Sequence, residues 1–303
     1  MKNNGVVIMT YGSATTAEHV AEYMAHIYHG APPEGIVKDF EERYRLVGRS
    51  PLIEITQHQA QRIEEELGDD YVVRTGMLHS APFIAQAVRE CKEAGAERCV
   101  GVILSPQFSS FIMDGYRSVF ERAAIECGFP KEDIAIAAPW PTEKNFIALL
   151  GERVKMSLAG LQAVQHKKIP VIFTTHSLPK RVVEKDPAYL EQLRSTIRAV
   201  TEYINDPSLE WYAGYQSAGH TPEEWLKPDM TDILADLRRK GESAVLIVPI
   251  QFLSDHLEVL FDLDIAARKQ CEEFGIAYHR IELPNTDPAF VKSIARVVYN
   301  TSI

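Results

Sequence analysis

The chain has 303 residues, which at about 150 residues per domain favours two domains and excludes a small scaffold held together by disulfides or zinc. Hydrophobic residues make up 46% of the chain and charged residues 24%, so the composition excludes a disordered protein. A net charge of -10 argues against a surface that binds nucleic acid or anionic lipid, and an anionic ligand therefore needs a local basic cluster.

Short β-branched runs alternate with longer helical patterns along the chain, which is typical of parallel βαβ units and predicts the α/β class. In chain order, strands are expected at residues 5–10, 71–77, 99–104, 134–137, 170–174, 210–215, 244–249 and 277–281. Apolar side chains at helical spacing predict a helix over residues 17–28. The break between Leu158 and Pro170 predicts an N-terminal domain over 1–160 and a C-terminal domain over 161–303, with the final helix able to pack back on the first domain.

The apolar runs, such as residues 244–250, are much shorter than the ~20 residues that a membrane span needs. The first residues lead directly into an apolar run with no signal segment, which predicts a cytoplasmic protein without stable membrane association. We expect a monomer that binds no nucleic acid. The cysteines are isolated from one another, which predicts reduced thiols rather than a zinc site or an iron–sulfur cluster; they are Cys91, Cys99, Cys127 and Cys271.

The two halves of the chain repeat each other weakly at their strand ends. A Gln-Phe pair at Gln107 recurs at Gln251, and polar residues and a cysteine follow both pairs at the same spacings. This favours a duplicated α/β domain in which equivalent strand ends face one interdomain cleft. In open α/β sheets, ligands bind beyond the carboxyl ends of the strands.

A histidine ends one of the most apolar strands. Residues 171–175 are an extended apolar and β-branched run, His176 follows, and Pro179 stops the strand from continuing. An imidazole at the mouth of a sheet can accept protons or bind a metal ion. The alternative is a histidine that only caps the strand by hydrogen bonding.

Two acids follow the strand at 244–249. Ser254 or Asp255 is expected to cap a helix, and Glu258 and Asp262, four residues apart, then share one face of it. Two carboxylates on one face can bind a hard cation or pass protons along the helix. The alternative is one favourable first-turn acid and one solvated acid, which fits Asp262 better because Glu258 lies among apolar neighbours.

Residues 40–52 form a basic segment in an otherwise acidic protein. Arginine forks and hydroxyl groups suit the carboxylates of a ligand, although a solvated basic turn is the ordinary alternative. The groups concerned are Arg43, Tyr44, Arg45, Arg49 and Ser50.

These segments closely resemble the signature stretches of the ferrochelatases. The resemblance rests on residues 175–179 (Thr-His-Ser-Leu-Pro), 214–217 (Gly-Tyr-Gln-Ser), 225–229 and 255–264, and it is ordered along nearly the whole chain. Within that family, the chain is most similar to the short enzymes of Gram-positive bacteria that use coproporphyrin III. It lacks the membrane-associating segment and the C-terminal cysteine cluster of the animal enzymes.

The resemblance implies two Rossmann-like domains around a porphyrin cleft, with Fe²⁺ as a substrate, two pyrrole protons as products and no permanently bound cofactor. It implies that His176 and Glu258 face the ring, either as base and proton relay or as ligands of the incoming ion. Tyr11 would lie on the opposite side of the ring as an axial ligand of the product iron, and Asp262 would bind metal weakly. The residues that map onto the porphyrin site are Tyr11, Tyr28, His29, Arg43, Tyr44, Ser50 and Tyr116.

The chain departs from the family at Tyr28 and His29, where close relatives carry a pair of arginines, and at Ala266, where relatives often carry a third acid. Its predicted function is ferrochelatase activity on coproporphyrin III. The alternatives are a protoporphyrin IX ferrochelatase, a cobalt or nickel chelatase of another tetrapyrrole, and a porphyrin or haem carrier that performs no chemistry.

Overall fold

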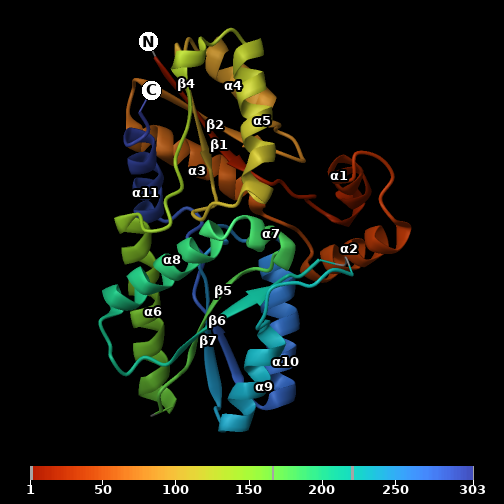
Figure 1. Ribbon diagram of the computed structural model, residues 1–303, viewed down its shortest axis with the longest axis vertical. Helices are drawn as coiled ribbons and strands as arrows, with labels where there is room; N and C mark the ends of the chain where they lie inside the picture. The colour runs from red at the N-terminus through yellow and green to blue at the C-terminus, as the bar shows by residue number, and fades with distance from the viewer. Residues whose placement is uncertain (1–2, 166, 220–221, 303) are drawn as a thin grey trace. The chain divides into compact units, whose positions relative to one another are not determined.

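A computed structural model describes residues 3–165, 167–219 and 222–302. The chain forms two compact units (Figure 1). Unit 1 consists of Met1–Trp140, Ser254–Leu257 and Asn285–Ile303, and unit 2 consists of Pro141–Leu253 and Glu258–Pro284.

Each unit is built on one four-stranded parallel sheet, and the two sheets have the same strand order. In unit 1 the order is β2-β1-β3-β4, from β1 (Asn4–Thr10), β2 (Tyr71–Met77), β3 (Arg98–Ile103) and β4 (Ile134–Ile136). In unit 2 the order is β6-β5-β7-β8, from β5 (Val171–His176), β6 (Trp211–Gln216), β7 (Ala244–Pro249) and β8 (Ala277–Arg280). The predicted α/β class and all the predicted strands are confirmed, and the shared order agrees with a duplicated domain.

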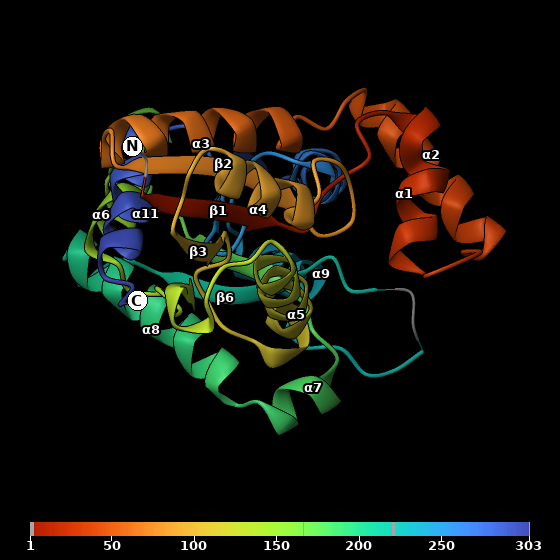
Figure 2. The same ribbon diagram turned by 90° about the horizontal axis from the view of Figure 1, so that it is seen from above.

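The sheet of unit 1 carries helices on both faces (Figure 2). Helices α4 (Ile84–Glu93) and α5 (Ser110–Glu126) pack together over Val7 and Met9 of β1. Helix α3 (Leu52–Leu67) packs against α11 (Pro288–Tyr299) on the other face. The predicted helix at 17–28 is present as a 3-10 turn at Ala17–His19 followed by α1 (Val20–Ile27), and α2 (Glu34–Val47) follows it. A further 3-10 turn, Lys131–Asp133, precedes β4.

Unit 2 has a similar layered arrangement. Helix α6 (Lys144–Gln165) packs against α8 (Ala188–Ile204), and the short α7 (Lys180–Lys185) precedes α8. The face of the sheet that carries Ile172 and Ile247 is covered by α9 (Met230–Lys240), a π-helix η3 (Val259–Ala267) and α10 (Arg268–Phe274). Figure 1 shows α9 and α10 side by side along this sheet.

The units divide at a different place from the predicted domain boundary. Residue 160 lies inside the continuous helix α6, and the chain changes unit at Trp140–Pro141 instead. Gly160, which lies within the predicted break, does not end this helix, because one glycine inside a helix costs only about 1 kcal/mol. The final helix α11 belongs to unit 1.

Within the part of the chain that the structure describes, no helix combines the length and the apolar character required to cross a bilayer. The four thiols are free, and Cys91, Cys99 and Cys271 are buried.

Candidate active site

His176 is the last residue of β5, and its main chain is held on both sides. Its N–H donates to Oε1 of Gln251 at 2.9 Å, and its carbonyl accepts from the hydroxyl of Tyr189 at 3.3 Å. Gln251 also donates from Nε2 to the Tyr189 hydroxyl at 3.0 Å, so the three residues form a closed ring of hydrogen bonds. Burial raises the pKa of Tyr189, which keeps its hydroxyl protonated as a donor.

The side chain of Gln251 continues the sheet beyond the end of β7. The last backbone bond of this ladder runs from the N–H of Ile250 to the carbonyl of Thr174 at 3.1 Å. The next donor on β5 is the N–H of His176, and the side-chain oxygen of Gln251 accepts from it. The end of β5 therefore keeps a fixed position although its neighbouring strand has ended.

The imidazole of His176 has a defined tautomer. Its Nδ1 lies in hydrogen-bond contact with the carbonyl oxygen of Ser177, and a carbonyl only accepts, so Nδ1 carries the hydrogen. In the neutral ring, Nε2 is then left with a lone pair. That nitrogen lies 3.6 Å from Oε2 of Glu258. When the ring is neutral, a base and a carboxylate oxygen therefore face each other, an arrangement that attracts a proton or a metal cation.

Glu258 lies at the start of an unusual helix. Leu257 and Glu258 form the first helical residues, and the π-helix η3 follows directly. The side chains of His176 and Glu258 are 28% and 36% exposed, so both are reachable from solvent. π-Helices are rare and occur frequently at functional sites, which agrees with a functional role for this helix start.

Asp262 has a different partner from Glu258. Its carboxylate accepts a hydrogen bond from the hydroxyl of Ser217, which directly follows β6. Ser217 has a φ of 57°, in the left-handed region that a non-glycine residue seldom adopts. Strained backbone of this kind persists where the surrounding structure holds it and concentrates at functional sites.

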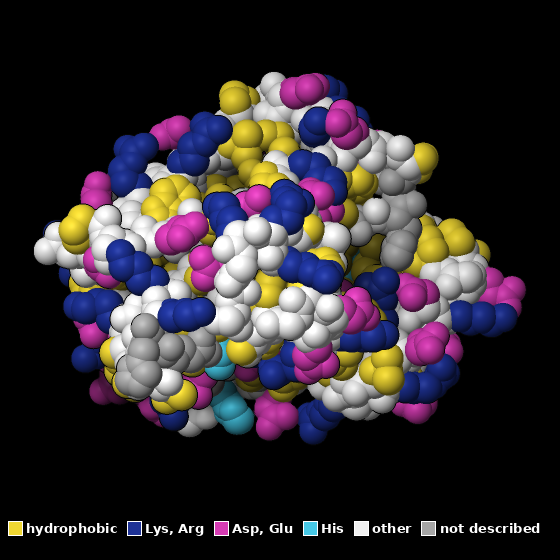
Figure 3. Space-filling model, turned by 90° about the horizontal axis from the view of Figure 1, so that it is seen from below, with side chains coloured by type: hydrophobic (Ala, Val, Ile, Leu, Met, Phe, Trp, Pro, Cys, Tyr) yellow, Lys and Arg dark blue, Asp and Glu magenta, His cyan; other side chains and the backbone are white. Residues whose placement is uncertain are grey.

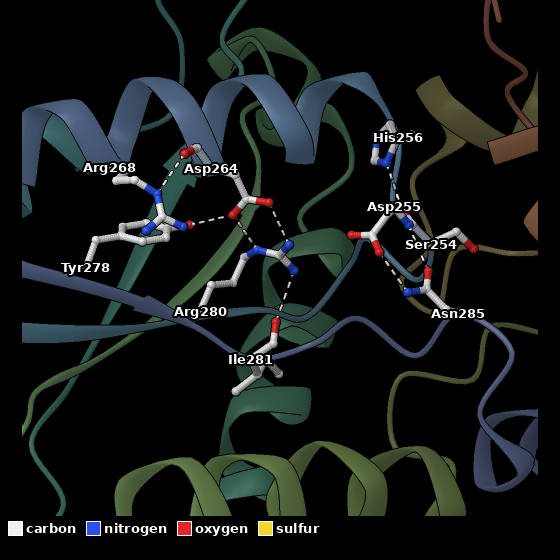
Figure 4. A network of polar contacts seen from close by, with 9 residues as sticks. All are labelled: Ser254, Asp255, His256, Asp264, Arg268, Tyr278, Arg280, Ile281 and Asn285. Carbon is white, nitrogen blue, oxygen red and sulfur yellow. Dashed lines mark hydrogen bonds and ion pairs between the residues drawn. The ribbon is translucent and has the colours of Figure 1, made fainter. Parts of the chain in front are cut away.

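A second acid of the π-helix, Asp264, holds that helix to the edge strand β8 of the sheet. The carboxylate of Asp264 receives Nε and Nη2 of Arg280 on β8 at 2.8 and 2.7 Å and the hydroxyl of Tyr278 at 3.1 Å (Figure 4). The side chains of Asp264 and Arg280 are only 24% and 14% exposed. A bidentate, mostly buried pair of this kind fixes the helix that carries Glu258 and Asp262.

The predicted capping role of Ser254 and Asp255 is wrong. Both residues belong to unit 1, where the N–H of Asp255 donates to Oδ1 of Asn285 at 2.9 Å and its Oδ2 accepts from Nδ2 at 2.7 Å (Figure 4). The hydroxyl of Ser254 accepts from Gln59 at 2.9 Å. These polar side chains bind a neighbouring segment, and the first helical residue is Leu257.

Tyr11 lies directly after β1 in unit 1 and is 44% exposed. Its ring lies 4.5 Å from the ring of His79, whose Nδ1 is 3.0 Å from Nδ1 of His26. Burial, followed by the charges of His26 and His29, lowers the pKa of His79 to about 4. Gly12 approaches Ser80 so closely that a Cβ would lie 2.5 Å from its hydroxyl oxygen, which explains the glycine after Tyr11.

The predicted propionate anchors of unit 1 differ in exposure. Arg43 pairs with Asp39 at 2.8 Å and is 22% exposed. The hydroxyls of Tyr44 and Ser50 are buried and lie 2.7 and 2.8 Å from the hydroxyl of Ser13. All three anchors are therefore held by neighbouring side chains.

The other residues predicted to contact the porphyrin are placed as follows. Tyr28 and His29 are exposed at the end of α1, and His29 has a φ of 52°. Tyr116 is 4% exposed in the core between α5 and the sheet, and burial raises its pKa. The role of each as a porphyrin contact stays a prediction.

Charged side chains of both signs are interspersed on the face in Figure 3. Across residues 3–165, 167–219 and 222–302, no group of three or more His, Cys, Asp or Glu side chains is arranged to hold a metal ion.

Gln251, Tyr189 and Ser217 also belong to this site, although the sequence does not predict a role for them there. Gln251 and Ser217 were visible as residues that directly follow strands or repeat between the halves, but their partners are far away in the sequence. Tyr189 carried no signal of its own, because a tyrosine in a helix is ordinarily a core residue.

Comparison with known proteins agrees with the resemblance to the ferrochelatases. The sequence pattern of the family described as Ferrochelatase matches residues 3–302. The chain is 36% identical to the coproporphyrin III ferrochelatase of Anoxybacillus flavithermus, over 98% of this chain and 95% of the relative. It is 33% identical to that of Bacillus subtilis, over 98% and 97%. It is 34% identical to a protein named ferrochelatase from Deinococcus radiodurans, over 97% and 94%.

Solved structures share the fold at low sequence identity. SirB from Bacillus subtilis with Fe³⁺ has a TM-score of 0.61 at 11% identity, covering 98% of this chain and 94% of SirB. CbiX, described as the terminal enzyme for biosynthesis of sirohaem in denitrifying bacteria, has a TM-score of 0.54 at 16% identity, covering 98% of both chains. The predicted fold is thereby confirmed, and at these identities the likeness carries nothing about the reaction.

Proposed function

Since the chain belongs to the ferrochelatase family of metal-inserting enzymes, we propose that it inserts Fe²⁺ into coproporphyrin III with His176 and Glu258 as the groups that receive the pyrrole protons. The observation that carries the chemistry is the 3.6 Å approach of an imidazole lone pair to a carboxylate at the end of β5. The relatives named as coproporphyrin III ferrochelatases, which match along nearly the whole chain, support the choice of porphyrin.

The reaction breaks two pyrrole N–H bonds and forms bonds from the ring nitrogens to one Fe²⁺, so two protons must leave the ring. Nε2 of His176 accepts a proton because Nδ1 is already committed to the carbonyl of Ser177. The nearby carboxylate of Glu258 stabilises the resulting imidazolium and accepts a proton in turn. The iron stays ferrous throughout, and no redox partner is needed.

The porphyrin contacts belong to the same proposal. Exposed Tyr11 supplies a phenol oxygen for the product iron, and Arg43 supplies a guanidinium for a propionate. Fe²⁺ is a substrate here, and a chain without a permanent cofactor stays a prediction, as do the monomeric state and the cytoplasmic location.

The test is steady-state turnover with a choice of porphyrins. We expect kcat/KM with Fe²⁺ to be higher for coproporphyrin III than for protoporphyrin IX, because four propionates make more charge-assisted contacts than two. A preference for protoporphyrin IX would contradict the proposal that coproporphyrin III is the substrate, but it would not contradict ferrochelatase activity. If the protein binds both porphyrins but inserts iron into neither, the proposed metal-insertion reaction is wrong.

A further inference from the structure

Two buried polar side chains lie beside His176 in unit 2 and have no hydrogen-bond partner. Thr174 is 1% exposed and Gln216 is 5% exposed. Among the residues that the structure describes, nothing pairs with Oγ1 of Thr174 or with either Oε1 or Nε2 of Gln216. Two further polar residues of the same strand ends, Gln251 and Ser217, are by contrast fully engaged with His176 and Asp262.

The strand register puts these side chains on the face of the sheet where the two acids lie. His176 is paired with Gln216 and Thr174 with Gly214, and alternate residues of a strand share a face. A Cβ on Gly214 would lie 2.6 Å from Ile233 of α9, so this is the face that α9 and the π-helix cover. Thr174, His176 and Gln216 therefore point toward the helix that carries Glu258 and Asp262.

Buried polar groups in folded proteins are almost always paired, with protein or with ordered water. A porphyrin has no access to side chains that are at least 95% buried, whereas a single water molecule does. An internal water typically makes about three hydrogen bonds to polar groups that lack a protein partner. Thr174 and Gln216 together present three such atoms.

The distance between His176 and Glu258 is also consistent with a bound water molecule. Nε2 of His176 and Oε2 of Glu258 are 3.6 Å apart, which is beyond the 2.7–3.2 Å of a direct N–H···O hydrogen bond. A polar contact at that distance is commonly bridged by water. Because 3.6 Å leaves no room on the line between the two atoms, a bridging water lies to one side of the pair, and Thr174 and Gln216 share the face of the sheet with His176.

We propose that Thr174 and Gln216 bind ordered water beneath the π-helix and that this water carries protons from His176 to the acids; this role rests on the proposed function. The proton of a pyrrole N–H passes to Nε2 of His176. The Nε2–H bond then breaks as the water accepts that proton and releases one of its own to the carboxylate of Glu258. His176 and the water return to their starting states, and Glu258, which is 36% exposed, releases its proton to solvent before the second pyrrole proton is transferred.

The test replaces each polar group by an apolar side chain of similar size, in Thr174→Val, Gln216→Met and the double variant. We expect kcat for metal insertion to fall about tenfold. This is a smaller decrease than the ~10²–10⁴-fold decrease expected when a general base is removed. We expect KM for the porphyrin to stay unchanged and Tm not to rise. We also expect the ratio of kcat in H₂O to kcat in D₂O to differ from the ratio of the wild type. The control is Thr196→Val in α8, whose hydroxyl is bonded to Pro141 and Gln192, and which should lower Tm without changing kcat.

Unchanged kcat in the double variant would overturn the inference. A simultaneous rise of about 2–4 °C in Tm would identify the cause, because removing polar groups that truly lack partners stabilises a fold. A wild-type protein that converts no porphyrin would overturn the proposed function and the proton-transfer role together. Active wild type with unaffected variants would overturn the role of the water alone.

Discussion

The hydroxyl of Ser217 donates a hydrogen bond to the carboxylate of Asp262. Glu258, four residues earlier on the same helix, faces the imidazole of His176 instead. The two acids of the predicted pair therefore have different partners, one a neutral hydroxyl and the other a base. Different partners imply different contributions to the reaction.

Glu258→Gln is expected to reduce kcat by about 10²–10⁴-fold, because the amide accepts no proton and does not stabilise an imidazolium. Asp262→Asn is expected to lose about tenfold or less, since Ser217 can donate equally to the amide oxygen. The measurement is kcat with coproporphyrin III and Fe²⁺ for both variants. Equal losses would mean that the acids act as one unit.

His176→Ala is expected to remove nearly all metal insertion, with a loss of about 10²–10⁴-fold in kcat, while the porphyrin still binds. The reason is that Nε2 is the one nitrogen of this ring with an available lone pair. Turnover is measured alongside porphyrin binding by fluorescence. Near-normal turnover in the variant would contradict the assignment of His176 as the base.

Gln251→Leu is expected to destabilise the protein by about 1–3 kcal/mol, because the part-buried N–H of His176 loses its acceptor. Imprecise placement of His176 should also lower kcat, with KM for the porphyrin little changed. Gln251→Glu restores an acceptor oxygen and should recover most of kcat. If Gln251→Leu lowers Tm but leaves kcat intact, the ring of hydrogen bonds stabilises the fold without positioning the base.

Arg43→Ala is expected to narrow the preference for coproporphyrin III over protoporphyrin IX. A charge-assisted contact contributes about 1.5–3 kcal/mol, or roughly 10- to 150-fold in kcat/KM. The matched control is Arg45→Ala on the same helix, since Arg45 is 64% exposed and pairs with Glu41. A loss of preference in both variants would point to the overall charge of α2 rather than to Arg43.

Stability in acid is expected to depend on His79. Its pKa is about 4 in the folded protein and about 6.5 when unfolded, so protonation favours the unfolded state. The full stability is present above pH 6.5 and is lost progressively as the pH falls toward 4. In His79→Asn, the decrease in Tm between pH 7 and pH 5 should be smaller than in wild type, and exposed His58→Asn serves as the control. An unchanged decrease would mean that His79 is equally easy to protonate in both states.

The sheets and their strand ends were predictable because buried parallel strands are short apolar runs with sharp limits. Residues 71–77 and 244–249 coincide with β2 and β7, and His176 was correctly placed at a strand end. The hydrogen bonds that hold His176 were not predictable, because Gln251 and Tyr189 come to it from other elements. Local patterns carry no information about such partners.

The π-helix was expected as an ordinary helix. Its buried residues Val259, Leu263 and Ala267 recur every four positions, whereas an α-helix alternates spacings of three and four. That strict spacing is a signal of the wider helix, although nine residues are too few to separate the two reliably. The same period of four aligns Glu258 with Asp262.

The chain passes between its units more than once, and this limits how the protein can be taken apart. Glu258 is joined by a single peptide bond to the short segment Ser254–Leu257 of unit 1, which Asn285 and Gln59 hold in place. No single cut releases either unit as one uninterrupted fragment. Exchange of a whole unit with that of a homologue would require several splice points, one of them directly beside the proposed proton acceptor.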